Sequence, residues 1–274
     1  FNVKFDKIMN ILTAQLPSGG YGYKFPSVKV SPMTFLEITR YLENLPSDDP
    51  LEKYLYDINL LIQEDETILD CYLMDVDFLI FYKKLCTVSG ELSYEIEVTC
   101  PECGKKMKKT IISSSLNKLS KKTISFEKDI HFKQIDQKIM NGAFIELGGH
   151  RYETIVPTVR EFMKVFQTYL RYRTVTDLKM IKTIALIKDF DYQGTQIEKD
   201  VLGATHGDVT LLLALRDLYY DRLEPIQLYC PECNKGKKAK ERRSVAVSVE
   251  SLTVDFFRDI CNNSPIDGSK ILFK

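Results

Sequence analysis

The chain contains the same four-residue segment twice, and each copy can supply two metal ligands. Cysteine, proline, glutamate and cysteine follow one another at 100–103 and again at 230–233. Two cysteines separated by two residues can turn both thiolates toward one ion, and two such pairs complete the tetrahedral coordination of zinc, with sulfur about 2.3 Å from the metal. We therefore predict a four-cysteine zinc site made of Cys100, Cys103, Cys230 and Cys233.

The residues around both copies are typical of a β-hairpin. A segment of alternating apolar and polar residues precedes each copy, at 92–98 and 225–229, and a lysine-rich segment follows it. Proline after the first cysteine fixes φ, and Gly104 and Asn234, directly after the two copies, tolerate the positive φ that a tight turn needs. The lysines would offset the charge of four thiolates and lower the pKa of the thiols.

Two other interpretations of the paired cysteines are a redox dithiol and a pair of disulfides. A redox pair of this spacing normally opens a helix after a buried strand, whereas both copies here lie in lysine-rich hairpins. Residues 104–229 separate the copies, against about 15 to 20 residues in the familiar zinc pattern, so one ion would close a very long loop. Because four thiolates leave zinc no open position, such a zinc would be structural and would stabilise the fold.

The composition is that of a folded chain without a general affinity for polyanions. Of the 274 residues, 44% are hydrophobic, and 38 basic residues balance 38 acidic ones, so nucleic-acid binding would need a local basic patch. No segment approaches the roughly 20 apolar residues of a membrane span, and no signal-peptide pattern opens the chain. The other cysteines, Cys71, Cys86 and Cys261, lie among apolar residues and are expected to be buried free thiols in a reducing compartment.

No recognisable catalytic motif is present. The sequence lacks a glycine-rich phosphate loop, a zinc-protease helix motif, a nucleophile elbow and a paired-carboxylate motif. Its three histidines have structural contexts: His131 is in an extended segment, His150 follows a Gly-Gly turn, and His206 lies near a helix start. We expect no enzymatic activity and no small-molecule substrate.

The apolar pattern predicts an α+β fold, with helical bundles, small antiparallel β elements and two cysteine hairpins joined in a zinc-ribbon-like site. Strands are predicted at 27–30, within 123–156 and at 244–249. Helices are predicted from the N-cap Ser31 to 45, over 51–62, from the N-cap Asp75 to 85, from a Thr158–Glu161 capping box to 172, and over 176–188, 208–223 and 251–261. The strand, proline and helix order of 25–45 returns at 150–172, which suggests an internal duplication.

These elements divide the chain into three parts. Residues 1–24 form an N-terminal arm and contact loop, 25–112 a first strand, helix and zinc-hairpin half, and 113–274 a second half with a β insertion, helices, the second zinc hairpin and a C-terminal helix. Residues 17–23 are dense in turn formers, and glycine–tyrosine loops can become ordered on a partner. We therefore expect a flexible contact loop there, and a folded core when residues 1–23 are removed.

Four segments in succession resemble the baseplate hub and hub-assembly proteins of contractile-tailed bacteriophages of the T-even-like type. They are the loop at 16–23, Val-Lys-Val-Ser-Pro-Met-Thr at 28–34, the aspartate-led segment at 75–81 and the first Cys-Pro-Glu-Cys, and together they cover roughly residues 12–110. The resemblance implies a non-catalytic component or assembly factor of the tail baseplate, with other baseplate and tail proteins as partners. It also implies a location in the virion and, during assembly, in the host cytoplasm.

The alternative from another class is a zinc-ribbon regulator that binds nucleic acid or polymerase in the infected cell. Lysines beside a zinc hairpin can contact phosphates. Aromatic residues are not interleaved among these lysines, as they are in many single-strand binders. We therefore expect that nucleic acid is not a partner.

Overall fold

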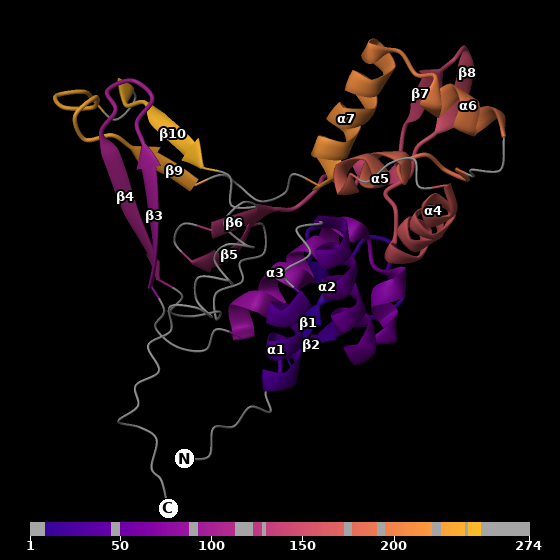
Figure 1. The fold of residues 1–274 in the computed structure, drawn as a ribbon, viewed down its shortest axis with the longest axis horizontal. Coiled ribbons are helices and arrows are strands. Elements are labelled where there is room, and N and C mark those ends of the chain that lie inside the picture. Colours follow the sequence, from indigo (N-terminus) through magenta and orange to yellow (C-terminus); the bar gives the residue numbers. More distant parts are fainter. Residues whose placement is uncertain are drawn as a thin grey trace, which may run out of the picture.

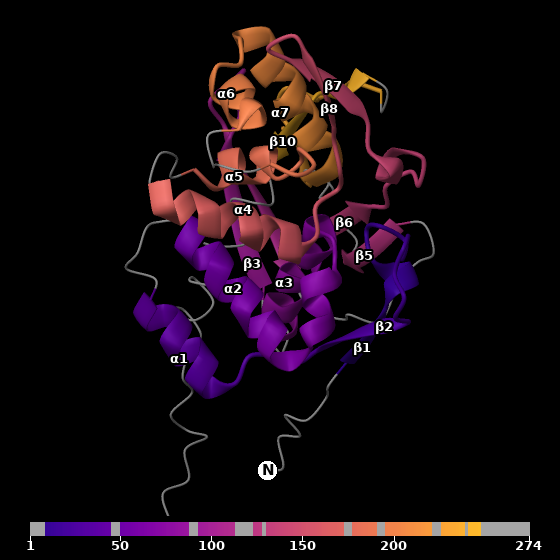
Figure 2. The same cartoon turned by 90° about the vertical axis from the view of Figure 1, so that its right-hand side faces the viewer.

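The computed structural model describes residues 9–44, 50–87, 93–112, 123–127, 130–172, 177–190, 195–220, 226–238 and 241–247. In these ranges the fold is α+β, as predicted. Figure 1 shows a body of helices with the strands that carry the four cysteines to one side of it. In the turned view of Figure 2, α4 lies next to α2 and α3.

The first half of the chain begins with strands and continues with helices. Its elements are β1 (Met9–Leu12), the short 3-10 helix η1 (Thr13–Gln15), β2 (Ser27–Val30), α1 (Phe35–Asn44), α2 (Pro50–Glu64), η2 (Glu66–Asp70), α3 (Leu73–Thr87), β3 (Ser93–Thr99) and β4 (Lys106–Ile112).

The second half follows a similar order. Its elements are β5 (Thr123–Glu127), β6 (Ile130–Lys133), η3 (Ile139–Asn141), β7 (Phe144–Leu147), β8 (His150–Glu153), α4 (Val159–Tyr172), α5 (Leu178–Ile184), α6 (Gln196–Leu202), α7 (His206–Tyr220), β9 (Ile226–Tyr229) and β10 (Ser244–Val247).

Every strand in the described ranges belongs to a two-stranded antiparallel sheet, and the pairs are β1 with β2, β3 with β4, β5 with β6, β7 with β8, and β9 with β10. A two-stranded sheet is marginally stable by itself, so each pair depends on packing. The pair of β1 and β2 buries Ile11, Val28 and Val30 in the main core. This packing makes the first strands part of the helical body.

The main core lies between helices of both halves. Its central helix is α3, whose Val76, Phe78 and Leu79 are fully buried and which contacts α2, α4 and α7. A helix with apolar side chains on several faces is expected at such a position. Phe162 of α4 packs edge-on against Tyr54 of α2, with 5.7 Å between ring centroids.

Hydrogen bonds between backbone groups also join the two halves. They run from the N–H of Leu73 to the carbonyl of Pro157 (3.0 Å), from Val159 to Cys71 (2.9 Å) and from Ile135 to Pro17 (2.9 Å). The first two connect the start of α3 with the start of α4. The third connects the loop after η1 with the segment after β6.

A partly buried cation joins four helices. The Nζ atom of Lys182 in α5 lies 2.8 Å from Oδ2 of Asp77 in α3, 4.1 Å from the ring centroid of Tyr54 in α2 and 5.0 Å from that of Tyr220 in α7. The Tyr54 hydroxyl also donates to Oδ1 of Asp77 at 2.6 Å. A charge removed from water needs such compensation, so this cluster fixes the four helices relative to one another.

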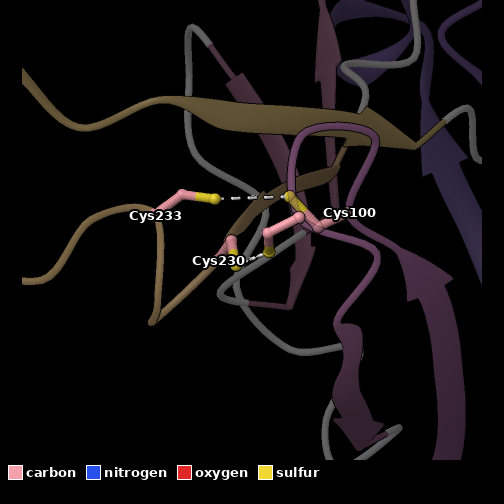
Figure 3. Close-up of side chains that lie close together, drawn as sticks. Cys100, Cys230 and Cys233 are labelled. Carbon is pink, nitrogen blue, oxygen red and sulfur yellow. Dashed lines mark hydrogen bonds between the residues drawn. The ribbon is translucent and has the colours of Figure 1, made fainter.

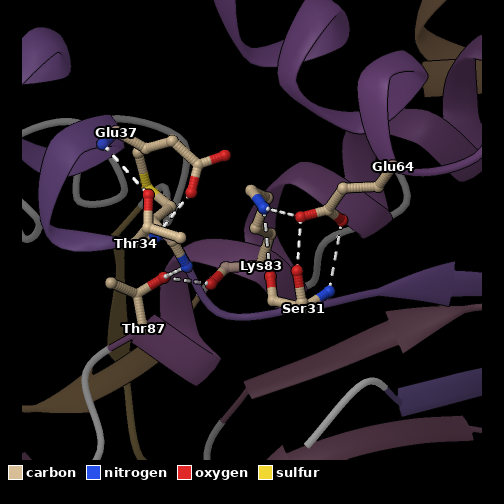
Figure 4. A network of polar contacts seen from close by, with 7 residues as sticks. Ser31, Thr34, Glu37, Glu64, Lys83 and Thr87 are labelled. Carbon is tan, nitrogen blue, oxygen red and sulfur yellow. Dashed lines mark hydrogen bonds and ion pairs between the residues drawn. The ribbon is translucent and has the colours of Figure 1, made fainter. Parts of the chain in front are cut away.

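A second polar network fastens the residues before α1 to α2 and α3 (Figure 4). Ser31 donates its N–H to Oε2 of Glu64 at 3.2 Å and its hydroxyl to Oε1 at 2.5 Å. Lys83 forms an ion pair with Glu64 and donates to the carbonyl of Ser31 at 3.0 Å. Ser31 is therefore anchored to α2. The sequence had suggested Ser31 as the N-cap of α1, and this prediction is wrong.

The first helix begins later than predicted. Thr34 is the capping residue, because its hydroxyl accepts the N–H of Glu37 at 3.2 Å while Glu37 accepts the N–H of Thr34 at 2.5 Å. This reciprocal arrangement is a capping box, and α1 starts at Phe35 behind it.

The capping box predicted before α4 is confirmed. Thr158 donates its N–H to Glu161 at 2.7 Å, and Glu161 donates its N–H to the Thr158 hydroxyl at 3.3 Å. Each half therefore contains a strand pair, a Thr-x-x-Glu cap and helices in the same order. Each also has a 15-residue helix, α3 or α7, directly before its cysteine-bearing strands, an order that supports the suggested duplication.

The segment at 17–23 is anchored to the core at Ser18 and Tyr23, while residues 19–23 stay partly or fully exposed, so its role as a contact loop stays a prediction. Ser18 is fully buried and donates its N–H to Oδ1 of Asp75 at 2.8 Å, and the Tyr23 hydroxyl donates to Oδ2 at 2.6 Å. Asp75 lies inside the first turn of α3 and not at its N-cap. Its carboxylate accepts the hydrogen bonds from this loop. Leu16 is also fully buried. The glycine and proline residues of this segment predicted its turns but not its attachment to α3 through Asp75.

The remaining predicted elements differ mainly at their boundaries. The helix predicted at 51–62 is α2, and that at 208–223 is α7. The helix expected over 176–188 is the shorter α5, which begins after the N-cap Asp177, and the strand expected at 244–249 is described as β10. The predicted C-terminal helix at 251–261, with Cys261, lies outside the described residues.

Deletion of residues 1–23 should destabilise the protein rather than leave its core intact. The deletion removes β1 and the buried Leu16 and Ser18. We expect a loss of several kcal/mol in the free energy of unfolding, since one large buried apolar side chain alone contributes about 1.5–3 kcal/mol. Thermal unfolding followed by circular dichroism measures this loss. A truncation ending at residue 8 keeps every described contact and is the control; equal midpoints would contradict the prediction.

Asp75 should lower the free energy of unfolding as the pH rises from mildly acidic to neutral. Burial raises the pKa of its carboxyl group to about 6. The unfolded chain therefore ionises Asp75 at lower pH than the folded chain, and stability falls as pH rises from about 4 to about 6. Relative to the wild type, Asp75→Asn should gain about 2–3 kcal/mol of stability between pH 4 and pH 7. Urea unfolding at both pH values checks this, and a pH-independent difference would count against it.

Candidate metal centre

The first cysteine pair lies where β3 turns into β4. The last paired residues of the two strands are Thr99 and Lys106, and Cys100 and Cys103 lie between them. The N–H of Cys100 donates to the carbonyl of Lys105 at 2.8 Å, and the N–H of Gly104 donates to the carbonyl of Cys100 at 2.9 Å. Gly104 has φ of +70°, which a side chain would disfavour. These bonds fold both cysteines onto one side of the turn.

The second pair follows β9, and a buried asparagine organises its turn. Asn234 donates its side-chain N–H to the carbonyl of Cys230 at 2.9 Å and to that of Arg243 at 2.8 Å, and it accepts the N–H of Arg243 at 2.8 Å. The expected positive φ occurs at Gly236, with +75°, and not at Asn234. The prediction for Asn234 was therefore wrong, because its side chain is required for these hydrogen bonds.

The four sulfur atoms meet in one cluster (Figure 3). Sγ of Cys100 lies 3.8 Å from Sγ of Cys233, and Sγ of Cys103 lies 3.5 Å from Sγ of Cys230. All four lie within 4.8 Å of one another. In a regular tetrahedron with zinc–sulfur bonds of about 2.3 Å, the sulfurs are about 3.8 Å apart. The observed separations fit such a site and are much longer than the roughly 2.05 Å of a disulfide.

The thiols of the cluster differ in exposure and in pKa. Cys100 and Cys230 are buried, Cys233 is partly buried, and Cys103 is exposed. The backbone N–H of Cys233 lowers the pKa of Cys230 to about 7, whereas a hydrogen bond with Cys103 raises the pKa of Cys233. The metal-free cluster therefore retains protons that a metal must displace, so metal affinity falls in acid.

Basic side chains near both cysteine pairs form ion pairs with glutamates. Lys105 lies 2.6 Å from Glu232, and Lys106 lies 2.5 Å from Glu97. Arg243 lies 2.5 Å from Glu102. The glutamate of each copy had no predicted role, although its repetition between the cysteines was a usable signal.

The histidines are placed as their sequence contexts predicted. His131 lies in β6 and His206 begins α7. His150 opens β8, where its Nδ1 atom lies 2.7 Å from Oδ2 of Asp200, which also accepts the Tyr152 hydroxyl at 2.5 Å. His150 thus takes part in a contact between β8 and α6.

In the part of the chain that the structure describes, the four cysteines are the one group of side chains found with metal-site geometry. Cys71 is a buried free thiol, as predicted. The side chain of Cys86 lies outside the described residues.

No protein-family model, curated protein or solved structure matches this chain. None of the helices in the described ranges has both the length and the apolar character that crossing a membrane requires.

Metal removal should open the cysteine cluster without unfolding the helices, because α3 and α7 contact each other directly and Lys182 bridges both. We expect one zinc per chain in the wild type and none in the double variant Cys103→Ser/Cys233→Ser, with at most a small change in helical circular dichroism. Cys71→Ala is the control, since it removes a cysteine outside the cluster. Elemental analysis and circular dichroism measure both quantities; loss of helix on chelation would refute the expectation.

Proposed function

We propose that the chain is a non-catalytic structural or assembly component of the tail baseplate of a contractile bacteriophage, held in shape by a structural zinc in a zinc-ribbon-like site. The observation that carries the structural role is the cluster of four sulfurs, all within 4.8 Å of one another. Four thiolates complete the coordination of zinc, so the centre has no position for a substrate.

The choice of metal follows from the chemistry of the ligands. Four thiolates in a tetrahedral arrangement favour zinc or iron–sulfur chemistry over hard cations. The sulfur separations of 3.5 and 3.8 Å suit one ion. Zinc is therefore the metal that we assign.

The assignment to a baseplate rests on the resemblance of residues 12–110 and on the architecture. The 16–23 loop and the 75–81 segment, which carry much of that resemblance, contact each other through Asp75. They therefore form one structural unit, which is what a shared fold would require. A neutral chain with a metal-closed site suits a component of a protein assembly more than a polyanion binder.

The alternative, a regulator that binds nucleic acid or polymerase, is less well supported. Its main argument was the lysine-rich segments. Lys105 and Lys106 are already paired with glutamates, which reduces the uncompensated charge that the first lysine-rich segment offers to a phosphate. The regulator is therefore the alternative function that the following test can reveal.

The test follows the chain in cells infected by a phage that encodes it. A tagged chain should co-purify with tail baseplates or their assembly intermediates and carry one zinc. The variant Cys103→Ser/Cys233→Ser should be incorporated less, while Cys71→Ala should be incorporated normally. Mass spectrometry and elemental analysis of the purified particles provide the measurement.

Two outcomes would overturn the proposal. One is recovery only with polymerase or nucleic acid, together with salt-sensitive binding of labelled DNA or RNA. The other is normal incorporation of a chain that holds no metal.

A further inference from the structure

Each glutamate between the paired cysteines forms an ion pair with a cation of the other cysteine-bearing turn. Oε1 of Glu102 lies 2.5 Å from Nη1 of Arg243, and Oε1 of Glu232 lies 2.6 Å from Nζ of Lys105. The two pairs therefore cross between the turns in opposite directions. Together they connect two segments that lie far apart in the sequence.

Both cations are tied by their backbones to a cysteine of their own turn. The carbonyl of Lys105 accepts the N–H of Cys100 at 2.8 Å. Arg243 is held through its N–H and its carbonyl by Asn234, which also donates to the carbonyl of Cys230 at 2.9 Å. A backbone shift at Lys105 would therefore move Cys100, and one at Arg243 would move Cys230 through Asn234.

We propose that these two ion pairs form a charge clasp that holds the cysteine turns in register and thereby sets the metal affinity of the centre. Glu102, Arg243, Glu232 and Lys105 are in this sense positioning residues. The inference rests on the proposed function only in that the centre binds zinc.

The clasp acts by preorganisation. A ligand binds more tightly when its site does not have to be assembled on binding. The pairs also neutralise two carboxylates next to four thiolates, which would otherwise repel them. Because all four side chains are largely exposed, each pair should change affinity by no more than about fivefold.

A single substitution separates the clasp from a simple effect of local charge. Glu102→Arg places a positive charge beside Cys103. If only local charge mattered, this change would tighten zinc binding. If the clasp matters, the introduced guanidinium would face the guanidinium of Arg243, and binding would weaken.

The experiment measures zinc affinity by competition with a chromophoric chelator, using the full chain. We expect Glu102→Arg to weaken zinc binding about three- to fivefold, and Glu102→Arg/Arg243→Glu to restore it to within about twofold, because the pair is re-formed with reversed charges. Cobalt absorption checks that four thiolates still bind the metal in every variant. Circular dichroism checks the helices.

The matched control is the exposed pair of Glu153 and Lys188, whose charged atoms lie 2.7 Å apart. Glu153→Arg makes the same change of charge outside the cysteine turns and should leave zinc affinity unchanged. An equal loss in this control would overturn the clasp, because the loss would then not depend on the ion pairs between the cysteine turns.

The remaining outcomes distinguish the two proposals. A wild type with one zinc whose affinity is unchanged or increased by Glu102→Arg overturns the clasp and leaves the structural zinc standing. Failure of Glu102→Arg/Arg243→Glu to restore zinc affinity likewise overturns the clasp and leaves the structural zinc standing. A wild type that binds no zinc overturns both.

Discussion

Four sulfur atoms from two turns that are remote in the sequence lie within 4.8 Å of one another, close enough to hold one ion. A tetrahedral centre tolerates only small errors in its sulfur positions, so both turns need rigid support. Each turn joins two paired strands, β3 with β4 or β9 with β10, and β4 contacts β9. The packing of these two strand pairs against each other is therefore the constraint on which the cysteine cluster depends.

This arrangement differs from that of a stand-alone zinc finger. In a small finger, metal binding provides most of the folding free energy. Here the loop between the two turns is already closed by backbone bonds between the halves, such as that from Leu73 to Pro157, and by the cluster around Lys182. The entropy cost of closing a long loop is thus offset by the core, and the metal has only to order the turns themselves.

Polar groups define the contacts between parts of the molecule. Asp75 holds the 16–23 loop on α3, and Lys182 joins four helices. Glu102 and Glu232 connect the two cysteine turns. Hydrogen bonds and ion pairs are directional, so they fix how elements meet, whereas apolar burial supplies the larger and less directional part of the stability.

The sequence by itself determined which four cysteines come together, the α+β class and most of the helices, because these follow from spacing, residue chemistry and local periodicity. Only the tertiary structure decided that Leu16 and Ser18 are buried, that Asp75 accepts hydrogen bonds from their loop and does not cap α3, and that Asn234 holds Arg243. It also decided that each glutamate meets a cation of the other turn. Such contacts depend on which distant segments pack together, and a local pattern in the sequence carries no information on that choice.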